Sequence, residues 1–337
     1  MRRAVNGLRP AQIAFGAAEA PEHLSNRRWF MREGTARLNP FGKVDKVMMN
    51  PPPGSANLTE PAGPTDPTIS FIALREPGGR LISVYAAYSL HYVGGVGGIG
   101  GGDISADYYG MFCAALAKVQ NAAEYDPPFV AMMANGTSDD VNNVNFRNPR
   151  PPAPPYAQMR KVAVDVADKV NAALAKVEWK EGAELDARYR ELEVAWRPID
   201  AELLAWAKEK QANSAPSPNK TDLPSIYAGR VLRLAEAKNP ARIPLQVMRI
   251  GDVCIGTSPC ETFAEIGLEF KKRSPFAHSF MVELNHGYFG YLPTPRHFEL
   301  GGYETWPGTN WLEPQASVKM LDALLEMAAQ VAPKTKI

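Results

Sequence analysis

Three side chains that could bind a metal ion stand at the ends of apolar segments in this sequence. His91 ends the apolar run 81–90, Glu261 follows a second run, and Tyr291 lies in the glycine-rich loop after 280–284. Proteins of the α/β class place their binding sites beyond the ends of strands. These positions are therefore candidate ligands, and their imidazole, carboxylate and phenol groups could converge on one ion.

Each of these residues also has an ordinary structural explanation. A histidine at a strand end is often only a hydrogen-bonded residue, although the glycines after His91 allow another group to approach closely. Glu261 at the start of a predicted helix is favoured by the helix dipole. Tyr291 could be a core aromatic whose hydroxyl is satisfied locally. Residue type and position alone leave both explanations open.

The segment 285–306 contains two of the five histidines of the chain and three tyrosines, with no clean helical or strand period. Polar-tipped aromatics together with glycine and proline are typical of a shaped loop that lines a site. A packed surface loop with local hydrogen bonds would have the same composition.

Composition limits the possible functions. The chain has 337 residues, 45% of them hydrophobic, and 37 basic against 36 acidic residues. This length and composition predict a substantial core, and the charge balance offers no cationic surface to nucleic acid. Three cysteines without a CxxC pair predict neither a disulfide framework nor a cysteine zinc site, so a metal would need histidine and carboxylate ligands. We find no run long enough for a transmembrane helix and no signal peptide.

Apolar runs, helical periods and turn residues alternate along the chain, which predicts an α/β fold with a mixed sheet flanked by helices. We expect one elaborated domain over 1–337, with proline-rich connectors at 147–155 and 213–220. Strands are expected at 68–74, 81–90, 128–134, 192–196 and 280–284, and as a hairpin around residues 251–252. Helices are expected at 105–119, 156–177, 201–210, 222–237, 261–273 and 315–331.

Six segments, in this order, resemble the neutral/alkaline, non-lysosomal ceramidase family, and most of all its bacterial branch of shorter ceramidase-like proteins. They cover most of the chain and are fairly specific as a set. The matching segments are 26–45, 86–95, 103–110, 132–146, 255–273 and 285–304.

The resemblance implies a zinc amidohydrolase that cuts the amide of ceramide, with zinc held by two histidines, a glutamate and a tyrosine. By motif, His91 corresponds to the second histidine, Glu261 to the glutamate and Tyr291 to the tyrosine. Tyr303, in a Tyr-Glu pair, corresponds to a tyrosine that helps to polarise the scissile carbonyl. Such a nitrogen and oxygen ligand set with an open position suits Zn²⁺.

The chain departs from the family pattern at its beginning. The first zinc histidine of the family lies in a His-x-His element upstream of residue 26, and nothing in 1–25 resembles it. We expect a member that is truncated at its N-terminus; an incomplete metal site is the alternative. A replacement ligand could come from His286, Asp103 or Asp107.

A second departure concerns the Gly-Asp-x-Ser-Pro-Asn element of the family, which corresponds to 139–143 here. Asn142 replaces the serine, and an asparagine can contact a substrate but cannot attack it. An acyl-enzyme mechanism would need Thr137 or Ser138 instead, so a metal-bound water is the preferred nucleophile. We expect Asp140 and Asn142 to belong to the catalytic site together with Tyr303.

The leading hypothesis is a zinc-dependent amide hydrolase that acts on a small-molecule or lipid amide. The alternative is a non-catalytic, ceramidase-like binding protein that has kept the fold. A third hypothesis is a sugar- or polyol-binding enzyme that uses Tyr303, Trp306 and Trp311 as a stacking platform. Relatives are secreted or membrane-associated, whereas this chain shows no export signal, so its location and its oligomeric state stay open.

Overall fold

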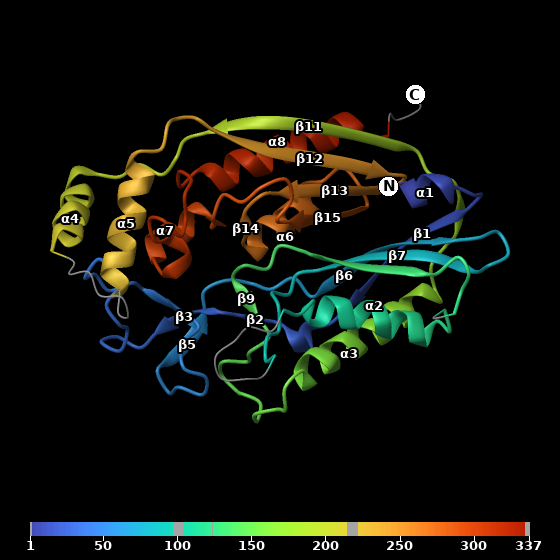
Figure 1. Ribbon diagram of the computed structural model, residues 1–337, viewed down its shortest axis with the longest axis horizontal. Coiled ribbons are helices and arrows are strands. Elements are labelled where there is room, and N and C mark those ends of the chain that lie inside the picture. Colours follow the sequence, from blue (N-terminus) through green and yellow to red (C-terminus); the bar gives the residue numbers. More distant parts are fainter. Residues whose placement is uncertain (1, 97–103, 123, 214–221, 334–337) are drawn as a thin grey trace.

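The computed structural model describes the chain apart from residues 1, 97–103, 123, 214–221 and 334–337. It contains two mixed sheets that pack face to face, each covered by helices on its outer side (Figure 1). The predicted α/β class with flanking helices is confirmed, although the strands form two main sheets and not one.

The first sheet has the strand order β10-β1-β6-β7-β8. Its apolar side chains pack on two helices, α2 and α3, in one core cluster. The hairpin expected from the runs 68–74 and 81–90 is confirmed as β6 and β7, and β8 then lies parallel to β7. The bounds in this half are β1 Gln12–Glu19, β6 Thr68–Arg75, β7 Leu81–Tyr88, α2 Asp107–Val119, β8 Val130–Asn135, α3 Ala157–Leu174 and β10 Lys180–Glu181.

The second sheet has the order β11-β12-β13-β15, in which β13 and β15 are parallel and the other pairs antiparallel. The hairpin predicted around 251–252 is confirmed, and Gly251 supplies the positive φ that its turn requires. Helices α6 and α8 cover the outer face. The bounds here are β11 Leu185–Val194, β12 Ala241–Ile250, β13 Val253–Ser258, α6 Ala264–Arg273, β15 His278–Glu283 and α8 Ala316–Val331.

A small apolar cluster joins the inner faces of the two sheets. Ile13 and Ile72 of the first sheet pack there with Ile255, Phe280 and Val282 of the second. Burial of such side chains on both faces stabilises this contact by roughly 1.5–3 kcal/mol for each large residue. This apolar cluster fixes β7 and β8 relative to β13 and β15. The candidate ligands follow three of these strands, β7, β8 and β13.

Shorter elements surround these two sheets. One group lies before and between the strands of the first sheet: α1 Arg2–Asn6, η1 Pro21–His23, β2 Ser25–Asn26, β3 Arg28–Met31, β4 Val47–Met49, β5 Leu58–Pro61 and β9 Val141–Asn142. Another follows in the C-terminal half: α4 Ala201–Ala212, α5 Leu223–Ala235, β14 Glu261–Thr262, β16 Tyr291–Leu292, α7 Pro295–Leu300 and η2 Tyr303–Thr305.

Two predicted element starts are wrong. The helix expected from Ser105 begins at Asp107, and the Ser105 hydroxyl accepts a hydrogen bond from the Asp107 amide. The helix expected at 261–273 begins at Ala264, because Glu261 and Thr262 form a short strand with Tyr291 and Leu292. The strand expected at 192–196 is the end of the longer β11, and most of the connector 213–220 lies outside the described residues.

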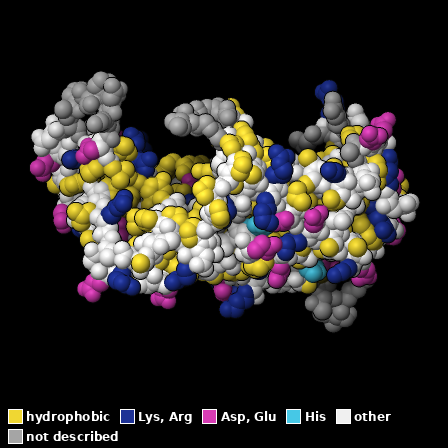
Figure 2. Space-filling model, turned by 90° about the horizontal axis from the view of Figure 1, so that it is seen from below, with side chains coloured by type: hydrophobic (Ala, Val, Ile, Leu, Met, Phe, Trp, Pro, Cys, Tyr) yellow, Lys and Arg dark blue, Asp and Glu magenta, His cyan; other side chains and the backbone are white. Residues whose placement is uncertain are grey.

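The surface mixes charges of both signs. On the face seen from below, basic and acidic side chains are interspersed, and hydrophobic side chains gather around a hollow toward the end that carries α4 and α5 (Figure 2). Among the described helices, none combines the length and the hydropathy needed to cross a bilayer.

Candidate metal centre

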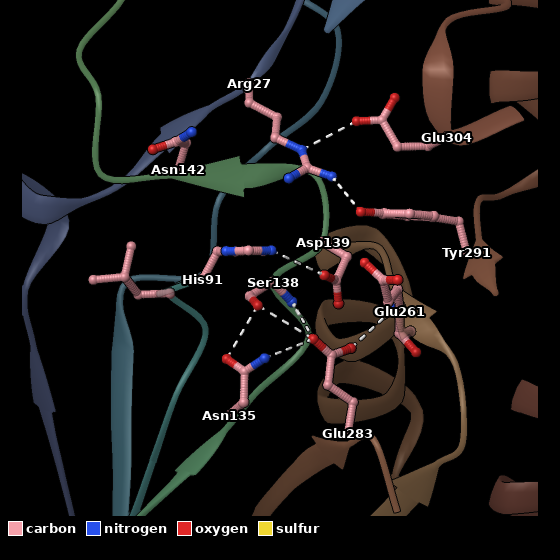
Figure 3. Close-up of polar contacts among 12 residues, drawn as sticks. Arg27, His91, Asn135, Ser138, Asp139, Asn142, Glu261, Glu283, Tyr291 and Glu304 are labelled. Carbon is pink, nitrogen blue, oxygen red and sulfur yellow. Dashed lines mark hydrogen bonds and ion pairs between the residues drawn. The ribbon is translucent and has the colours of Figure 1, made fainter. Parts of the chain in front are cut away.

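His91, Asp139 and Glu261 converge on one point, although they are far apart in the sequence (Figure 3). Their potential ligand atoms all lie within 4.8 Å of one another, and His91 Nε2 is 3.7 Å from Asp139 Oδ1. Asp139 is buried, whereas His91 and Glu261 are half-buried. One imidazole nitrogen and two carboxylates at such spacing can share a divalent cation.

The fold explains why these residues meet. His91 follows β7, Asp139 follows β8, and Glu261 follows β13. Strands β7 and β8 are parallel, as are β13 and β15, so within each sheet these ends lie at one edge. Since the two sheets pack face to face, their polar segments meet beyond the ends of the strands.

Glu283, the last residue of β15, holds the segments that carry two of these groups. Its Oε1 accepts hydrogen bonds from Asn135 Nδ2 at 3.0 Å and from the Ser138 amide at 3.2 Å, and its Oε2 accepts one from the Thr262 amide at 2.8 Å. Burial and the neighbouring Asp139 raise the pKa of Glu283. This carboxyl therefore ties the loop after β8 to β14, beside the cluster.

Arg27 places a cation next to the cluster. Its Nε donates to Glu304 Oε1 at 3.1 Å, and its Nη2 donates to the Tyr291 hydroxyl at 3.1 Å (Figure 3). Arg28 also pairs with Glu304, which is fully buried. Burial acts to lower the pKa of Arg27, but Glu304 and Tyr291 raise it above its usual value, so the guanidinium stays charged.

Tyr291 lies directly beside Glu261, because the strands β14 and β16 are paired with these two residues in register. Burial raises the pKa of Tyr291, so its phenol is protonated at neutral pH. Glu261 is itself held by Tyr288, whose hydroxyl donates to Glu261 Oε1 at 2.6 Å. The structure thus brings together His91, Glu261 and Tyr291, the predicted ligands, while their ligand role stays a prediction.

The electrostatics of the cluster suit a bound cation. Burial and the nearby Arg27 lower the pKa of His91 to about 4, which leaves the neutral imidazole that metals bind. Burial and the carboxylate of Glu261 raise the pKa of Asp139, since two negative charges lie close together. Within the described structure, Asp139 Oδ2 is buried without a hydrogen-bond partner. A buried carboxylate oxygen in this position is a free ligand atom.

The other residues predicted for catalysis lie elsewhere. Asp140 is fully buried and structural: its Oδ1 accepts from the Ala264 amide and its Oδ2 from Asn26 Nδ2, both at 2.8 Å. Asn142 points away from His91 and Asp139 (Figure 3), and its Nδ2 donates to Asn50 Oδ1 at 3.2 Å. These two residues therefore join segments of the fold and are not part of the cluster.

The proposed replacement ligands are also engaged outside the cluster. His286 bonds Gln246 at 2.9 Å. Asp107 accepts hydrogen bonds from the amides of Val93 and Gly94, which shapes the loop after His91, and Asp103 lies outside the described residues. Ser138, considered as an alternative nucleophile, is fully buried in the Glu283 network.

A pocket of about 520 Å³ opens next to the cluster. Tyr288 and Tyr291 line it, and these residues contact Glu261 and Arg27. Tyr303 also lines the pocket and packs edge-on against Tyr291, with ring centroids 5.7 Å apart. A pocket of this size can hold a small organic molecule, and Tyr303 is placed to contact it.

Of the aromatic residues considered for sugar stacking, Trp311 lines this pocket but Trp306 does not. Trp306 packs edge-on against Tyr227 and Tyr303, and its indole donates to Asp45 Oδ2 at 2.8 Å. These contacts are those of a packing residue.

Asp139, Arg27 and Glu283 were not singled out from the sequence. Asp139 lies in a polar loop after an apolar run, and Glu283 lies at the end of another, which is the signal that identified His91. Arg27 gave no comparable signal, because its partners Tyr291 and Glu304 are more than 260 residues away.

A second group with metal-ligand spacing consists of Glu22, His23 and Asp165. Lys169 lies 3.0 Å from Glu22, and Lys161 lies 2.5 Å from Asp165. Both carboxylates are thus already neutralised by ammonium groups, which compete with a metal ion. The cluster of His91, Asp139 and Glu261 is the stronger candidate.

Comparison with known proteins supports the same fold. The solved structures that match the chain include one described as a ceramidase complexed with C2, at a TM-score of 0.65 and 15% identity, and the neutral ceramidase of Pseudomonas aeruginosa, at 0.61 and 16%. The alignments cover 98% and 100% of this chain but only 55% of each of the others. No protein-family model and no curated protein matches the sequence.

The chain therefore has the fold of the neutral ceramidases. The resemblance inferred from its motifs is confirmed for the fold, and the chain spans about half the length of the structures it matches.

Proposed function

We propose that the protein is a metal-dependent hydrolase of linear amides, with Zn²⁺ as the metal. The observation that carries this proposal is the convergence of His91, Asp139 and Glu261 at the ends of three strands, with a free carboxylate oxygen. The ceramidase fold supports the reaction class, because it matches proteins described as ceramidases.

His91, Asp139 and Glu261 would hold the ion. Tyr291 would be the fourth ligand, as the resemblance implies. Asp139 then stands in for the upstream histidine of the family. When bound, Zn²⁺ lowers the pKa of a water molecule and polarises a carbonyl oxygen. His91 offers a neutral nitrogen for this purpose because its pKa is lowered to about 4.

The surrounding residues supply positioning and hydrogen-bond donors. Arg27 keeps its charge because its pKa is raised, so it can donate to negative charge that develops on the oxygen of a scissile amide. Tyr291 keeps its proton in the metal-free protein because burial raises its pKa, and it would act as a ligand only after losing that proton. Tyr303 lines the pocket beside them and can contact the substrate. Glu283 fixes the loop after β8 and so holds Asp139 in place.

One observation favours a non-catalytic binding protein instead. Arg27 donates to the Tyr291 hydroxyl, so a positive charge already contacts a predicted metal ligand. A cation in this position weakens the attraction of the cluster for a second cation. Metal binding and turnover must therefore be measured separately.

Metal content distinguishes the two functions in part. Purified protein should bind one Zn²⁺ by plasma mass spectrometry and by calorimetry, and His91→Ala and Glu261→Gln should each lose it. His286→Ala is the matched control, because His286 lies outside the cluster. Unaltered metal content in both cluster variants would refute the proposal.

Turnover completes the distinction. The zinc-loaded protein should release amine from short N-acyl amides, with the release abolished in Glu261→Gln and retained in His286→Ala. If the wild type binds zinc but cleaves no amide in a panel of acyl lengths, the non-catalytic alternative holds.

A further inference from the structure

We propose that the pocket beside the cluster binds the carboxylate of its substrate through Arg230, with Arg233 nearby. The substrate class is then an N-acylated amino acid, an amide with one apolar part and one anionic end. The hydrolysis of this substrate rests on the proposed function, whereas its binding does not.

The two arginines reach the pocket from α5. Arg230 and Arg233 are three residues apart on this helix, so they lie on the same side of it, and both line the pocket. Tyr288 and Tyr291 line the same pocket and connect it to Glu261 and Arg27. A molecule that fills this space can place one end at the arginines and another near the cluster.

Arg230 is held in a defined position. Its guanidinium carbon lies 4.8 Å from the centroid of the Tyr227 ring, and Tyr227 is 1% exposed. Its side-chain stem lies against Gly308, where an added Cβ would meet Arg230 Cβ at 2.4 Å. Its Nη1 is 3.4 Å from Thr309 Oγ1. An arginine held in this way loses little conformational entropy when it binds a carboxylate.

Neither arginine has an acidic partner in the part of the chain that the structure describes. No carboxylate lines the pocket, and none of the ion pairs found involves Arg230 or Arg233. Arg27 differs, because Glu304 neutralises it. A guanidinium has five N–H donors, and among the described residues Arg230 directs them only at the hydroxyl groups of Thr309 and Tyr227. Its remaining donors match the two oxygens of a carboxylate.

The rest of the pocket wall is apolar or aromatic. Trp196, Leu234 and Trp311 contribute to it. An uncharged amide would leave the arginines without a partner, and a small anion without an apolar body would leave these walls exposed. A molecule with both features uses the whole pocket.

Binding to metal-free protein tests the pocket alone, because a carboxylate can also bind a metal ion. N-hexanoyl-phenylalanine and its uncharged primary amide are titrated by calorimetry into protein treated with a chelator. We expect the acid to bind about 10- to 100-fold more tightly than the amide, as is typical of a hydrogen-bonded ion pair. N-hexanoyl-taurine, a sulfonate, should bind less tightly than the carboxylate.

Three variants locate the effect. Arg230→Gln should remove most of the preference for the acid, and Arg230→Lys should keep part of it, since a lysine retains the charge but not the planar fork. Arg242→Gln is the matched control: Arg242 is 69% exposed on β12, outside the pocket, and its change alters the net charge equally. Circular dichroism of each variant checks its folding.

The outcomes separate this inference from the proposed function. Equal binding of acid and amide to the wild type, an unchanged preference in both Arg230 variants, or tighter binding of the sulfonate would overturn the inference. If the acid binds through Arg230 but zinc-loaded protein does not cleave it, the inference stands and the proposed function fails. If uncharged amides are cleaved as fast as the acid and Arg230→Gln has no effect, the proposed function stands and the inference about Arg230 fails.

Discussion

Replacing Asp139 by asparagine should change the stability in opposite directions with and without metal. In the metal-free protein, the carboxylates of Asp139 and Glu261 lie within 4.8 Å, which corresponds to a repulsion of about 3.5 kcal/mol at an effective dielectric constant of 20. Arg27 offsets part of this repulsion. We therefore expect Asp139→Asn to raise the free energy of unfolding of the metal-free protein by about 1–2 kcal/mol.

The sign of the pH dependence follows from the raised pKa of Asp139. An acid whose pKa is higher in the folded than in the unfolded state loses stability as pH rises above its unfolded value of about 3.9. The gain from asparagine should therefore be larger at pH 8 than at pH 5.

With zinc present, the same variant should be less stable than the wild type. Saturation at 100 times the dissociation constant stabilises a protein by about 2.7 kcal/mol, and a loss of affinity of about 100-fold removes most of this gain. The lost ligand atom is the one without a hydrogen-bond partner among the described residues, Asp139 Oδ2.

Urea denaturation at pH 8, with chelator or with zinc, measures both effects. Asp165→Asn is the control. Asp165 is half-buried, pairs with Lys161 and belongs to the other group with metal-ligand spacing, that of Glu22 and His23. The reasoning is refuted if Asp139→Asn destabilises the metal-free protein, or if zinc stabilises this variant as much as the wild type.

Three further changes test the fold around the site. Arg27→Met should cost about 3 kcal/mol of unfolding free energy, because it leaves the buried Glu304 with less positive charge; an unchanged urea midpoint would contradict this. Gly267→Ala should cost about 1–3 kcal/mol, because its Cβ would meet Thr137 Oγ1 at 2.1 Å, and Thr137→Ala should restore part of the loss in thermal unfolding. Burial opposes the ionisation of Glu265, but hydrogen bonds from neighbouring histidine and arginine side chains outweigh it and lower its pKa to about 2. The ionised Glu265 therefore stabilises the fold above pH 4.5, and this contribution is lost as pH falls toward 2. In urea titrations, Glu265→Gln should be less stable than the wild type by about 1 kcal/mol at pH 6, after allowance for solvent screening, and should match it near pH 2.

Local patterns predicted much of the fold. The hairpin of β6 and β7 and the helix α3 follow from apolar spacing that extends over a few turns or strand residues. The position of His91 beyond the end of β7 was visible for the same reason, whereas the short strand β16, which begins at Tyr291, was not predicted. The division of the strands into two main sheets could not be predicted from such patterns, because strand order depends on contacts between distant segments.

The start of α6 shows where local reasoning fails. Glu261 resembles a residue placed to favour a helix dipole, yet it belongs to β14 and pairs with Tyr291. This pairing joins residues 30 positions apart, with α6 and β15 between them in the chain, so no local sequence period predicts it. The place of Asn142 in the family element predicted a substrate contact, which stays a prediction; the structure shows that β9 pairs with β2 and that the Asn142 amide donates to Asn50.

The charges around the cluster give a reason why a divalent ion suits this site. Two arginines and four carboxylates meet there: Arg27, Arg28, Asp139, Glu261, Glu283 and Glu304. Fully ionised, these groups carry an excess of two negative charges, and the imidazole beside them is neutral. Without an ion, burial first and the neighbouring carboxylates second favour the protonated forms, so the pKa values of both Asp139 and Glu283 are raised. A divalent cation would neutralise the same excess and leave every carboxylate free to act as a ligand or a hydrogen-bond acceptor.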